Sequence, residues 1–303
     1  MIAFAGIDLG GTKSEAQLFD KDWQLVERQR VSTPASYEAL VQTVAEQVVW
    51  CKTQAGAPLP VGVGAAGLVD ADDNAFTANL PAMGKPLPQD IAKAADHPIT
   101  YINDCRALAL SEAAFGAGQG YGTVMSLILG TGVGGGVAFD GRLRDGPTHL
   151  GGEYGHVAAS AAVVAEHNLP IYQCGCGRKG CIEAYIAGPS LQRMTQDLFG
   201  ASLTPTEIGQ QKDQAGAAQK VWNIWLDLTA DLLLSLIQGV DPNIIVIGGG
   251  LSQIPWIEVD LTARMKEKQL SGFGVPGVVR ASGGDASGAR GAALAAAQEA
   301  GHV

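Results

Sequence analysis

The amino-acid sequence predicts an α/β protein of two domains, and three observations support this prediction. Strand-like apolar runs alternate with helix-like segments along most of the chain. The chain has 303 residues, of which 47% are hydrophobic and 17% charged, which suits a folded protein of about two domains. A pattern of strand, Gly-Thr turn and strand occurs at Gly11-Thr12 and again at Gly130-Thr131. We therefore expect an N-terminal domain over residues 1–118 and a C-terminal domain over residues 119–303, whose last helix is a candidate for packing back on the first domain.

In the N-terminal domain, residues 3–33 predict a strand, a glycine turn, a second strand, a turn at Asp20 to Asp22 and a third strand. Apolar residues at helical spacing in residues 36–56 predict an amphipathic helix that ends at Gly56. VGVGAAGLVD (residues 61–70) follows as a buried strand that runs into a loop. A short strand then leads to a turn at Asn103-Asp104 and to an Ala-rich helix.

In the C-terminal domain, VMSLILG (residues 124–130) and VAFDGRL (residues 137–143) are the two strands of the repeated hairpin. Residues 220–239 predict a long buried helix that ends at Gly239. The segment DPNIIVIGGGLS then gives a short strand and a glycine loop. The closing segment GARGAALAAAQEA predicts a helix of small residues that packs closely on a sheet.

Charge and hydropathy exclude several kinds of partner. A formal net charge of −10 argues against a nucleic-acid partner, because the phosphates of nucleic acid bind basic surfaces. The apolar run at residues 230–237 is far shorter than the ~18 residues of a membrane span, and the N-terminus does not have the pattern of a signal peptide. We therefore expect a cytoplasmic protein that binds neither nucleic acid nor membrane.

The glycine-rich stretch GTGVGGG (residues 130–136) has three interpretations: a dinucleotide loop, a phosphate-binding loop or a tight β-turn. The spacing of Gly130, Gly132 and Gly135 matches a dinucleotide fingerprint, but such a loop must open a helix. Because VAFDGRLRDG has the pattern of a strand and a turn, the dinucleotide interpretation is disfavoured. A phosphate-binding loop and a tight turn both remain open.

Several polar residues follow predicted strands. Asp8 precedes Gly10-Gly11-Thr12-Lys13, where a carboxylate can hold hydrated Mg²⁺ and the turn can approach phosphate, although Asp is also common in turns. Asp104 is a candidate for accepting a hydroxyl proton, and Asn103-Asp104 is equally an ordinary helix N-cap pair.

Two further glycine-rich segments are ambiguous. Glu153 and His156 in LGGEYGH can bind a polyol or a metal, or can belong to a surface loop. The triple glycine after the strand at residues 244–247 is typical of a nucleotide base or ribose site, or of a tight turn.

Three cysteines lie close together in QCGCGRKGC. The spacing of Cys174, Cys176 and Cys181 suits three thiolate ligands of zinc, with His149, His156 or His167 as the fourth ligand. Four protein ligands leave no open position, so we expect this zinc to be structural. A metal-free fold is the alternative.

Taken together, DLGGTK, ND, GTGVGGG, GGEYGH, CGCGRKGCIE and IGGG resemble the motifs of the ROK sugar kinases, members of the actin-like ATPase superfamily. The resemblance spans nearly the whole chain. It implies an actin-like, ribonuclease H-like fold whose two domains close on a cleft, with ATP and Mg²⁺ as cofactors and a structural Zn²⁺. ANLPAMGKPL and QCGCGRKGCIEAYIAG most closely resemble family members that phosphorylate the 6-hydroxyl of N-acetyl-D-glucosamine.

Two alternatives accompany this expected activity. The first is a kinase for glucose, N-acetylmannosamine or mannose. The second is a non-catalytic sugar sensor. Sensors of this family carry a DNA-binding helix-turn-helix ahead of the kinase-like region, and we disfavour this alternative because the first glycine turn comes within about ten residues of Met1. The implied partners are a small amino sugar and ATP, with a homodimer as a candidate assembly.

The resemblance also implies roles for individual residues. It assigns Asp104 as the catalytic base and His156 as the fourth zinc ligand beside Cys174, Cys176 and Cys181. The implied sugar contacts are Gly67, Asn79, Asn103, Asp104, Glu153, His156 and Glu183. The implied ATP-binding residues are Asp8, Gly10, Gly11, Thr12, Lys13, Gly130, Thr131, Gly132, Val133, Gly134, Gly135, Gly136 and Gly249. One departure from the family pattern lies next to Gly67, where Ala66 stands in place of a proline common in other members.

Overall fold

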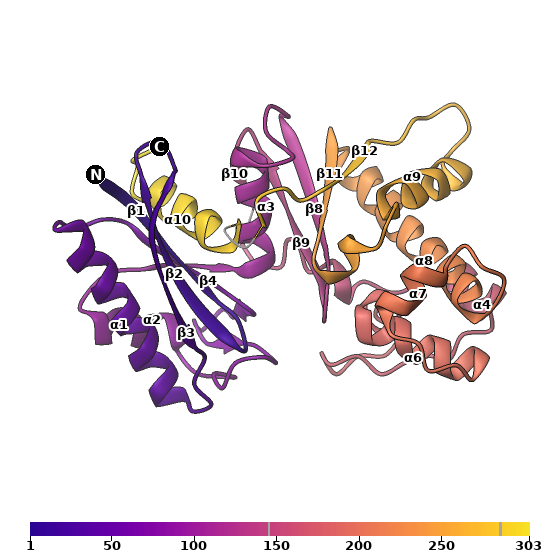
Figure 1. Cartoon of the computed structure of the whole chain (residues 1–303), viewed down its shortest axis with the longest axis horizontal. Coiled ribbons are helices and arrows are strands. Elements are labelled where there is room, and N and C mark those ends of the chain that lie inside the picture. Colours follow the sequence, from indigo (N-terminus) through magenta and orange to yellow (C-terminus); the bar gives the residue numbers. More distant parts are fainter. Residues whose placement is uncertain (145, 285–286) are drawn as a thin grey trace. The chain divides into compact units, whose positions relative to one another are not determined.

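The computed structural model describes residues 1–144, 146–284 and 287–303 and divides into two compact units (Figure 1). The first unit contains residues 1–120, 141–151 and 282–303. The second contains residues 121–140 and 152–281. The chain therefore returns to the first unit twice after residue 120. The second return contains the last helix, the predicted candidate for packing back on the first domain, whereas the return of residues 141–151 was not predicted.

A five-stranded mixed sheet forms the centre of the first unit, in the strand order β3-β2-β1-β4-β7. β2 pairs antiparallel with β1 and β3, whereas β4 is parallel to β1 and β7. The elements of this unit are β1 (Ile2–Leu9), β2 (Lys13–Asp20), β3 (Leu25–Ser32), α1 (Tyr37–Ala55), β4 (Val61–Ala65), β5 (Leu68–Val69), β6 (Ala75–Phe76), α2 (Leu87–Ala95), β7 (Thr100–Asn103), α3 (Asp104–Phe115), β10 (Arg142–Leu143) and α10 (Ser287–Glu299).

The two faces of this sheet are covered by different helices. Successive side chains of a strand point to opposite faces, so Ile7 and Asp8 of β1 face different layers. Ile7 belongs to a buried apolar cluster with Leu40 of α1 and Ile91 of α2. α10 lies against the other face (Figure 1), which is the face of Asp8.

The packing of α10 on β1 and β4 brings backbone against backbone. A Cβ atom added to Gly6 would lie 1.8 Å from the carbonyl oxygen of Ala289, and one added to Gly62 would lie 1.9 Å from that of Ala292. A side chain of any size would push the helix away from the sheet. This confirms the predicted close packing of a small-residue helix on a sheet.

We expect Gly62→Ala to lower the free energy of unfolding by about 1–3 kcal/mol or more, because the methyl group overlaps the backbone of α10. Thermal denaturation measures this effect. Gly64→Ala is the matched control on the same strand, since its Cβ would meet Ala107 Cβ at 3.4 Å, an ordinary contact. Equal losses of stability in both variants would contradict the account of the close contact.

The second unit repeats the pairing pattern of the first. Its strands lie in the order β9-β8-β11-β12, with β8 antiparallel to β9 and parallel to β11, and with β11 parallel to β12. This reproduces the order β2-β1-β4-β7 and confirms the duplication predicted from the repeated hairpin. The elements are β8 (Thr123–Leu129), β9 (Val133–Phe139), η1 (Tyr154–His156), α4 (Ala161–Glu166), α5 (Glu183–Ile186), α6 (Gly188–Phe199), α7 (Pro205–Gln211), α8 (Ala217–Val240), β11 (Ile244–Gly248), η2 (Gly250–Gln253), α9 (Ile257–Lys268) and β12 (Gly277–Arg280).

The long helix α8 supplies much of the core of the second unit. Trp225 is fully buried and stacks on Trp222 with 4.7 Å between ring centroids. The predicted end at Gly239 was wrong, because the helix continues to Val240 and is capped by Asp241 in the left-handed conformation (φ 49°). The Asp241 N–H bonds to the Ile237 carbonyl, so an Asp serves where a Gly was expected.

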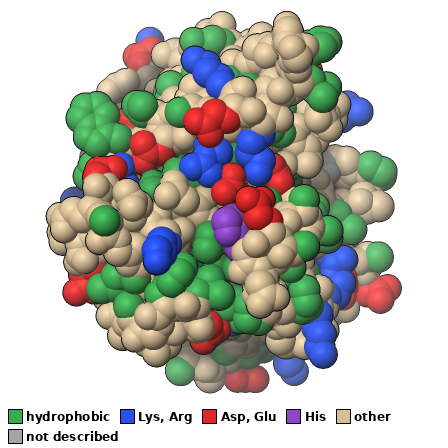
Figure 2. Space-filling view, turned by 90° about the vertical axis from the view of Figure 1, so that its right-hand side faces the viewer, with side chains coloured by type: hydrophobic (Ala, Val, Ile, Leu, Met, Phe, Trp, Pro, Cys, Tyr) green, Lys and Arg blue, Asp and Glu red, His purple; other side chains and the backbone are tan. Residues whose placement is uncertain are grey.

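Acidic and basic side chains intermingle on the face of the second unit shown in Figure 2. The second unit also contains ion pairs: Asp227 lies 2.7 Å from Arg264 and 3.3 Å from Lys268. In the described part of the chain, every helix is too short or too polar to cross a membrane.

Candidate active site

Asp104 stands at the N-terminus of α3, directly after β7. The Asn103 side-chain oxygen caps this helix by accepting the N–H groups of Cys105 at 3.0 Å and Arg106 at 3.3 Å. Asp104 Oδ1 accepts the Cys105 N–H at 2.9 Å and the Asn103 amide at 3.1 Å. The helix-cap role therefore falls to Asn103, which at the same time orients the carboxylate of Asp104.

The environment of Asp104 makes its carboxylate more basic than usual. Burial raises the pKa of Asp104, and the hydrogen bonds from Cys105 and Asn103 offset this only in part. A carboxylate held in one orientation with a raised pKa suits proton transfer from a hydroxyl group.

Gly67 lies between β4 and β5, and Asn79 lies on the loop after β6. The Asn103 amide also donates to the Gly67 carbonyl at 3.1 Å, which ties Gly67 to the start of α3. Gly67 has a φ of 140°, and a Cβ there would lie 2.7 Å from the Phe76 carbonyl oxygen. A Cβ at Gly11 would lie 2.8 Å from the Asn79 carbonyl oxygen. The first unit therefore places Asn79 against its glycine turn and Gly67 against the start of α3.

The first glycine turn connects β1 to β2 and is braced by β3. Gly10 N–H bonds to the Lys13 carbonyl at 3.0 Å, and the Thr33 hydroxyl donates to the Gly10 carbonyl at 2.6 Å. Gly11, Thr12 and Lys13 are exposed. Asp8 lies at the base of this turn beside α10, where a Cβ at Gly288 would be 2.9 Å from its carboxyl carbon.

The second glycine turn connects β8 to β9 in the second unit. Its exposed part is Thr131-Gly132, whereas Val133 and Gly134 to Gly136 are buried in β9. A Cβ at Gly135 would meet the Tyr154 ring at 2.7 Å, so packing alone explains this glycine. A Cβ at Gly249 (φ 81°) would lie 2.5 Å from the Leu129 carbonyl oxygen. Gly249 therefore lies against the end of β8, next to the second glycine turn.

Glu183 connects this second turn to the cysteine cluster. One carboxylate oxygen accepts the Val133 N–H at 2.8 Å, and the other accepts the Cys174 thiol at 3.8 Å. The sequence offered no sign of these two contacts.

Four side chains converge on one point of the second unit: His156, Cys174, Cys176 and Cys181, whose ligand atoms all lie within 4.8 Å of one another. Cys174 Sγ is 3.7 Å from His156 Nδ1, and Cys176 Sγ is 3.6 Å from Cys181 Sγ. Tetrahedral zinc with Zn–S bonds of ~2.3 Å places sulfur ligands about 3.8 Å apart, so these donors fit zinc.

Of the three candidate histidines, His156 lies in this cluster. His167 lies elsewhere, with Nε2 3.6 Å from Asp227 Oδ2, and His149 belongs to the first unit. The other ring nitrogen of His156, Nε2, lies 3.9 Å from Glu153 Oε2. The thiol of Cys176 is the most acidic of the three: burial raises its pKa, but hydrogen bonds, led by the Arg178 N–H, lower it to about 7.

Sequence reasoning missed three buried charged residues of the first unit. Arg106 donates to the carbonyl of Gly151 at 2.8 Å and to that of His149. Glu112 accepts the N–H groups of Ser282 at 2.9 Å and Gly283 at 2.8 Å, which fixes the segment before α10. Glu15 is paired with arginine on β3.

Comparison with known proteins places these features in context. The model of the ROK family matches residues 4–299. The chain is 40% identical to an N-acetylgalactosamine kinase of Shewanella sp. (strain ANA-3) and 38% identical to an N-acetyl-D-glucosamine kinase of Escherichia coli O6:H1, in each case over 96% of this chain and at least 96% of the relative. A ROK family glucokinase of Streptomyces griseus, solved with glucose and AMPPNP, superposes with a TM-score of 0.74 at 26% identity, over 98% of this chain and 100% of that chain.

Proposed function

Because the chain belongs to the ROK family and is a sugar kinase, we propose that it transfers the γ-phosphoryl group of ATP to the 6-hydroxyl of N-acetyl-D-glucosamine. The predicted fold class, the two-domain α/β actin-like fold of this family, is confirmed. The cleft between the domains stays a prediction. The 38% identical relative supports the choice of sugar.

The observation that carries the proposal is the carboxylate of Asp104, fixed at the start of α3 with a raised pKa. In the proposed step, the O6–P bond forms and the bond between the γ-phosphorus and the bridging oxygen of ADP breaks. The hydroxyl proton passes to Asp104, and ADP leaves. Phosphoryl transfer has a loose transition state, so Asp104 acts mainly by orienting the hydroxyl and accepting its proton late.

The remaining site residues divide between the two units. In the first unit, Gly67, Asn79 and Asn103 would contact the sugar beside Asp104. In the second, Glu153, His156 and Glu183 are proposed as further sugar contacts. The two exposed glycine turns would bind the phosphates through backbone N–H groups, with Asp8 holding Mg²⁺, which neutralises phosphate charge when bound.

A structural zinc ion is part of the same proposal. His156 Nδ1 and the thiolates of Cys174, Cys176 and Cys181 would hold it, and this leaves His156 Nε2 directed to the Glu153 side. We also propose a cytoplasmic location, because closely spaced cysteines in a reducing compartment more often bind metal than pair as disulfides. The homodimer stays a prediction.

We expect kcat to fall at low pH with a midpoint above about 3.9, the ordinary pKa of Asp. Asp104 must be ionised to accept the proton, and its raised pKa means that protonation begins at a higher pH than for an exposed Asp. The profile of kcat against pH, at saturating sugar and ATP, measures this midpoint. A midpoint at or below the ordinary value would contradict the role assigned to Asp104.

N-acetylgalactosamine is the second candidate substrate, because the 40% identical relative is named for that sugar. A coupled ADP-release assay on N-acetylglucosamine, N-acetylgalactosamine, N-acetylmannosamine, glucose and mannose compares kcat/KM values directly. The proposal predicts the highest value for N-acetylglucosamine. If another sugar has the higher kcat/KM, that sugar is the substrate instead. If a sugar binds but none of the five is phosphorylated, the result favours the sensor.

A further inference from the structure

A row of charged side chains crosses the first sheet at the glycine turn. In the strand register, Asp8 pairs with Glu15 and Glu15 pairs with Arg30, so the three residues stand side by side on β1, β2 and β3. Directly paired residues point to the same face of a sheet. All three therefore belong to the face of α10, which Asp8 contacts at Gly288.

Glu15 is a buried anion held by hydrogen bonds. Its side chain is only 3% exposed, and its carboxylate accepts Arg30 Nε and the Gln17 amide, the latter at 2.8 Å. Burial raises the pKa of Glu15, but the hydrogen bonds from Arg30 and Gln17 outweigh it and leave the pKa below the usual value. A buried carboxylate kept ionised in this way fixes the position of the guanidinium that it pairs with.

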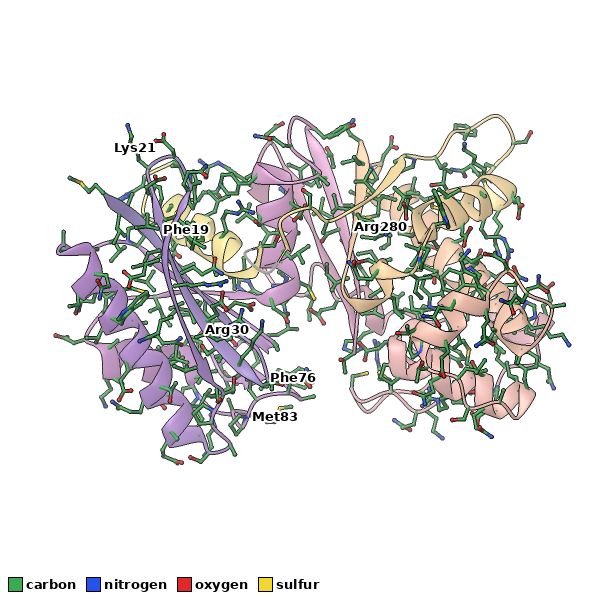
Figure 3. All side chains as sticks on the ribbon, in the orientation of Figure 1. Phe19, Lys21, Arg30, Phe76, Met83 and Arg280 are labelled. Atoms are coloured by element: carbon green, nitrogen blue, oxygen red, sulfur yellow. The ribbon has the colours of Figure 1, made fainter. Side chains whose placement is uncertain are left out.

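The guanidinium of Arg30 is held near the first glycine turn and is still exposed to solvent. The Arg30 side chain is 45% exposed although Nε is bonded to Glu15. Two residues further along β3, Ser32 pairs with Lys13, and Thr33 bonds to the backbone of Thr12 and Gly10. Figure 3 shows Arg30 on the sheet of the first unit.

Two arginines lie at the buried carboxylate of the row. A second arginine, Arg28, lies 4.0 Å from the same carboxylate, so two cations surround one buried anion. With Asp8 included, two carboxylates and two guanidiniums balance in formal charge, so the position of Arg30 near the turn, and not a net positive charge, favours a phosphate there. Arginine binds phosphate oxygens in a bidentate manner that a lysine cannot reproduce.

We propose that Arg30, positioned by Glu15, binds the γ-phosphoryl group of ATP during transfer. This proposal rests on the proposed kinase function and adds a residue to it. Asp8 would hold the cation and Arg30 the phosphoryl oxygens, on β1 and β3, which lie on either side of β2 in one sheet.

The test compares Arg30→Met with Arg28→Met. Arg28 is the matched control because it lies on the same strand and face, contacts the same carboxylate and is more exposed, at 60%, but pairs with Gln17, further from the turn. We expect Arg30→Met to weaken ATP binding and to lower kcat/KM for ATP by about 10- to 100-fold, the usual effect of losing a charged hydrogen bond. Arg28→Met should change both by less than about 3-fold, as exposed ion pairs contribute little.

Calorimetry with Mg·ATP and with Mg·ADP separates a phosphate contact from a structural role. Loss of a γ-phosphate contact weakens ATP binding and leaves ADP binding unchanged, whereas damage to the sheet weakens both. Equal losses for the two nucleotides, or equal effects of the two substitutions, would overturn the proposal. Arg30→Lys, which keeps the charge, provides the same comparison if Arg30→Met does not fold.

The calorimetric test of Arg30 does not depend on the proposed sugar-kinase function. If the unaltered protein phosphorylates no sugar, the kinase proposal fails, while the difference between ATP and ADP binding still decides the role of Arg30.

Discussion

Replacement of Asp104 by Asn should lower kcat by about 10²- to 10⁴-fold, the usual contribution of a positioned general base. Asn has nearly the same shape and can still accept the Cys105 N–H, so α3 should begin at the same residue. What it lacks is the ability to take the hydroxyl proton. Initial rates at saturating sugar and ATP measure the loss.

Sugar affinity distinguishes this role from a binding role. We expect the dissociation constant for N-acetylglucosamine, measured by calorimetry, to change by less than a few-fold, because the amide retains a hydrogen bond to the 6-hydroxyl. Asp22→Asn, at an exposed turn of the first unit, is the control for the substitution itself. A variant that turns over at nearly the unaltered rate would remove Asp104 from the mechanism.

Local sequence signals predicted the parts of the fold that depend on neighbouring residues. The helix predicted over residues 36–56 spans Tyr37–Ala55 and ends, as predicted, at Gly56, which has the left-handed conformation. The strand that follows the second glycine turn, rather than a helix, could be predicted because VAFDGRL lacks helical periodicity. The choice between Gly239 and Asp241 as the end of α8 could not, since both residues tolerate a helix terminus.

Residues whose partners are distant in sequence could not be found in this way. Glu112 bonds to Ser282 and Gly283, about 170 positions later, and nothing near Glu112 in the sequence indicates that it is buried. Arg30 pairs with Glu15 through the register of β2 with β3, which the turn at Asp20 to Asp22 sets. Both roles become apparent only from the strand pairing and the helix packing.

Glu183 lies between the cysteine cluster and the second glycine turn. Its carboxylate accepts a hydrogen bond from Cys174 at one oxygen and from the backbone of Val133 at the other. A Cβ at Gly132 would lie 2.8 Å from the same carboxylate, so the turn packs directly against it. Bound zinc would hold Cys174 as a thiolate, which has no proton to donate to Glu183. A metal would instead fix Glu183 through Cys181, two residues before it in the chain, and the turn through the hydrogen bond from Val133.

Cys176→Ser should therefore remove the zinc and, with it, the order of the second glycine turn. We expect the zinc content to fall from one ion per chain toward zero, and the midpoint of thermal unfolding to fall by about 10 °C, because structural zinc contributes directly to folding. We also expect kcat/KM for ATP to fall by at least about 10-fold, because the loss of order would reach the second glycine turn through the contact of Glu183 with Val133. Elemental analysis, calorimetry and the coupled assay measure the three effects.

His167→Gln is the control for this experiment, because His167 contacts Asp227 outside the cluster and should leave the zinc content unchanged. Zinc loss in both variants would mean that the fourth ligand was wrongly assigned. Zinc loss in Cys176→Ser with unchanged kinetics for ATP would show that the cluster and the second glycine turn are independent. The contacts of Glu183 would then have no role in nucleotide binding.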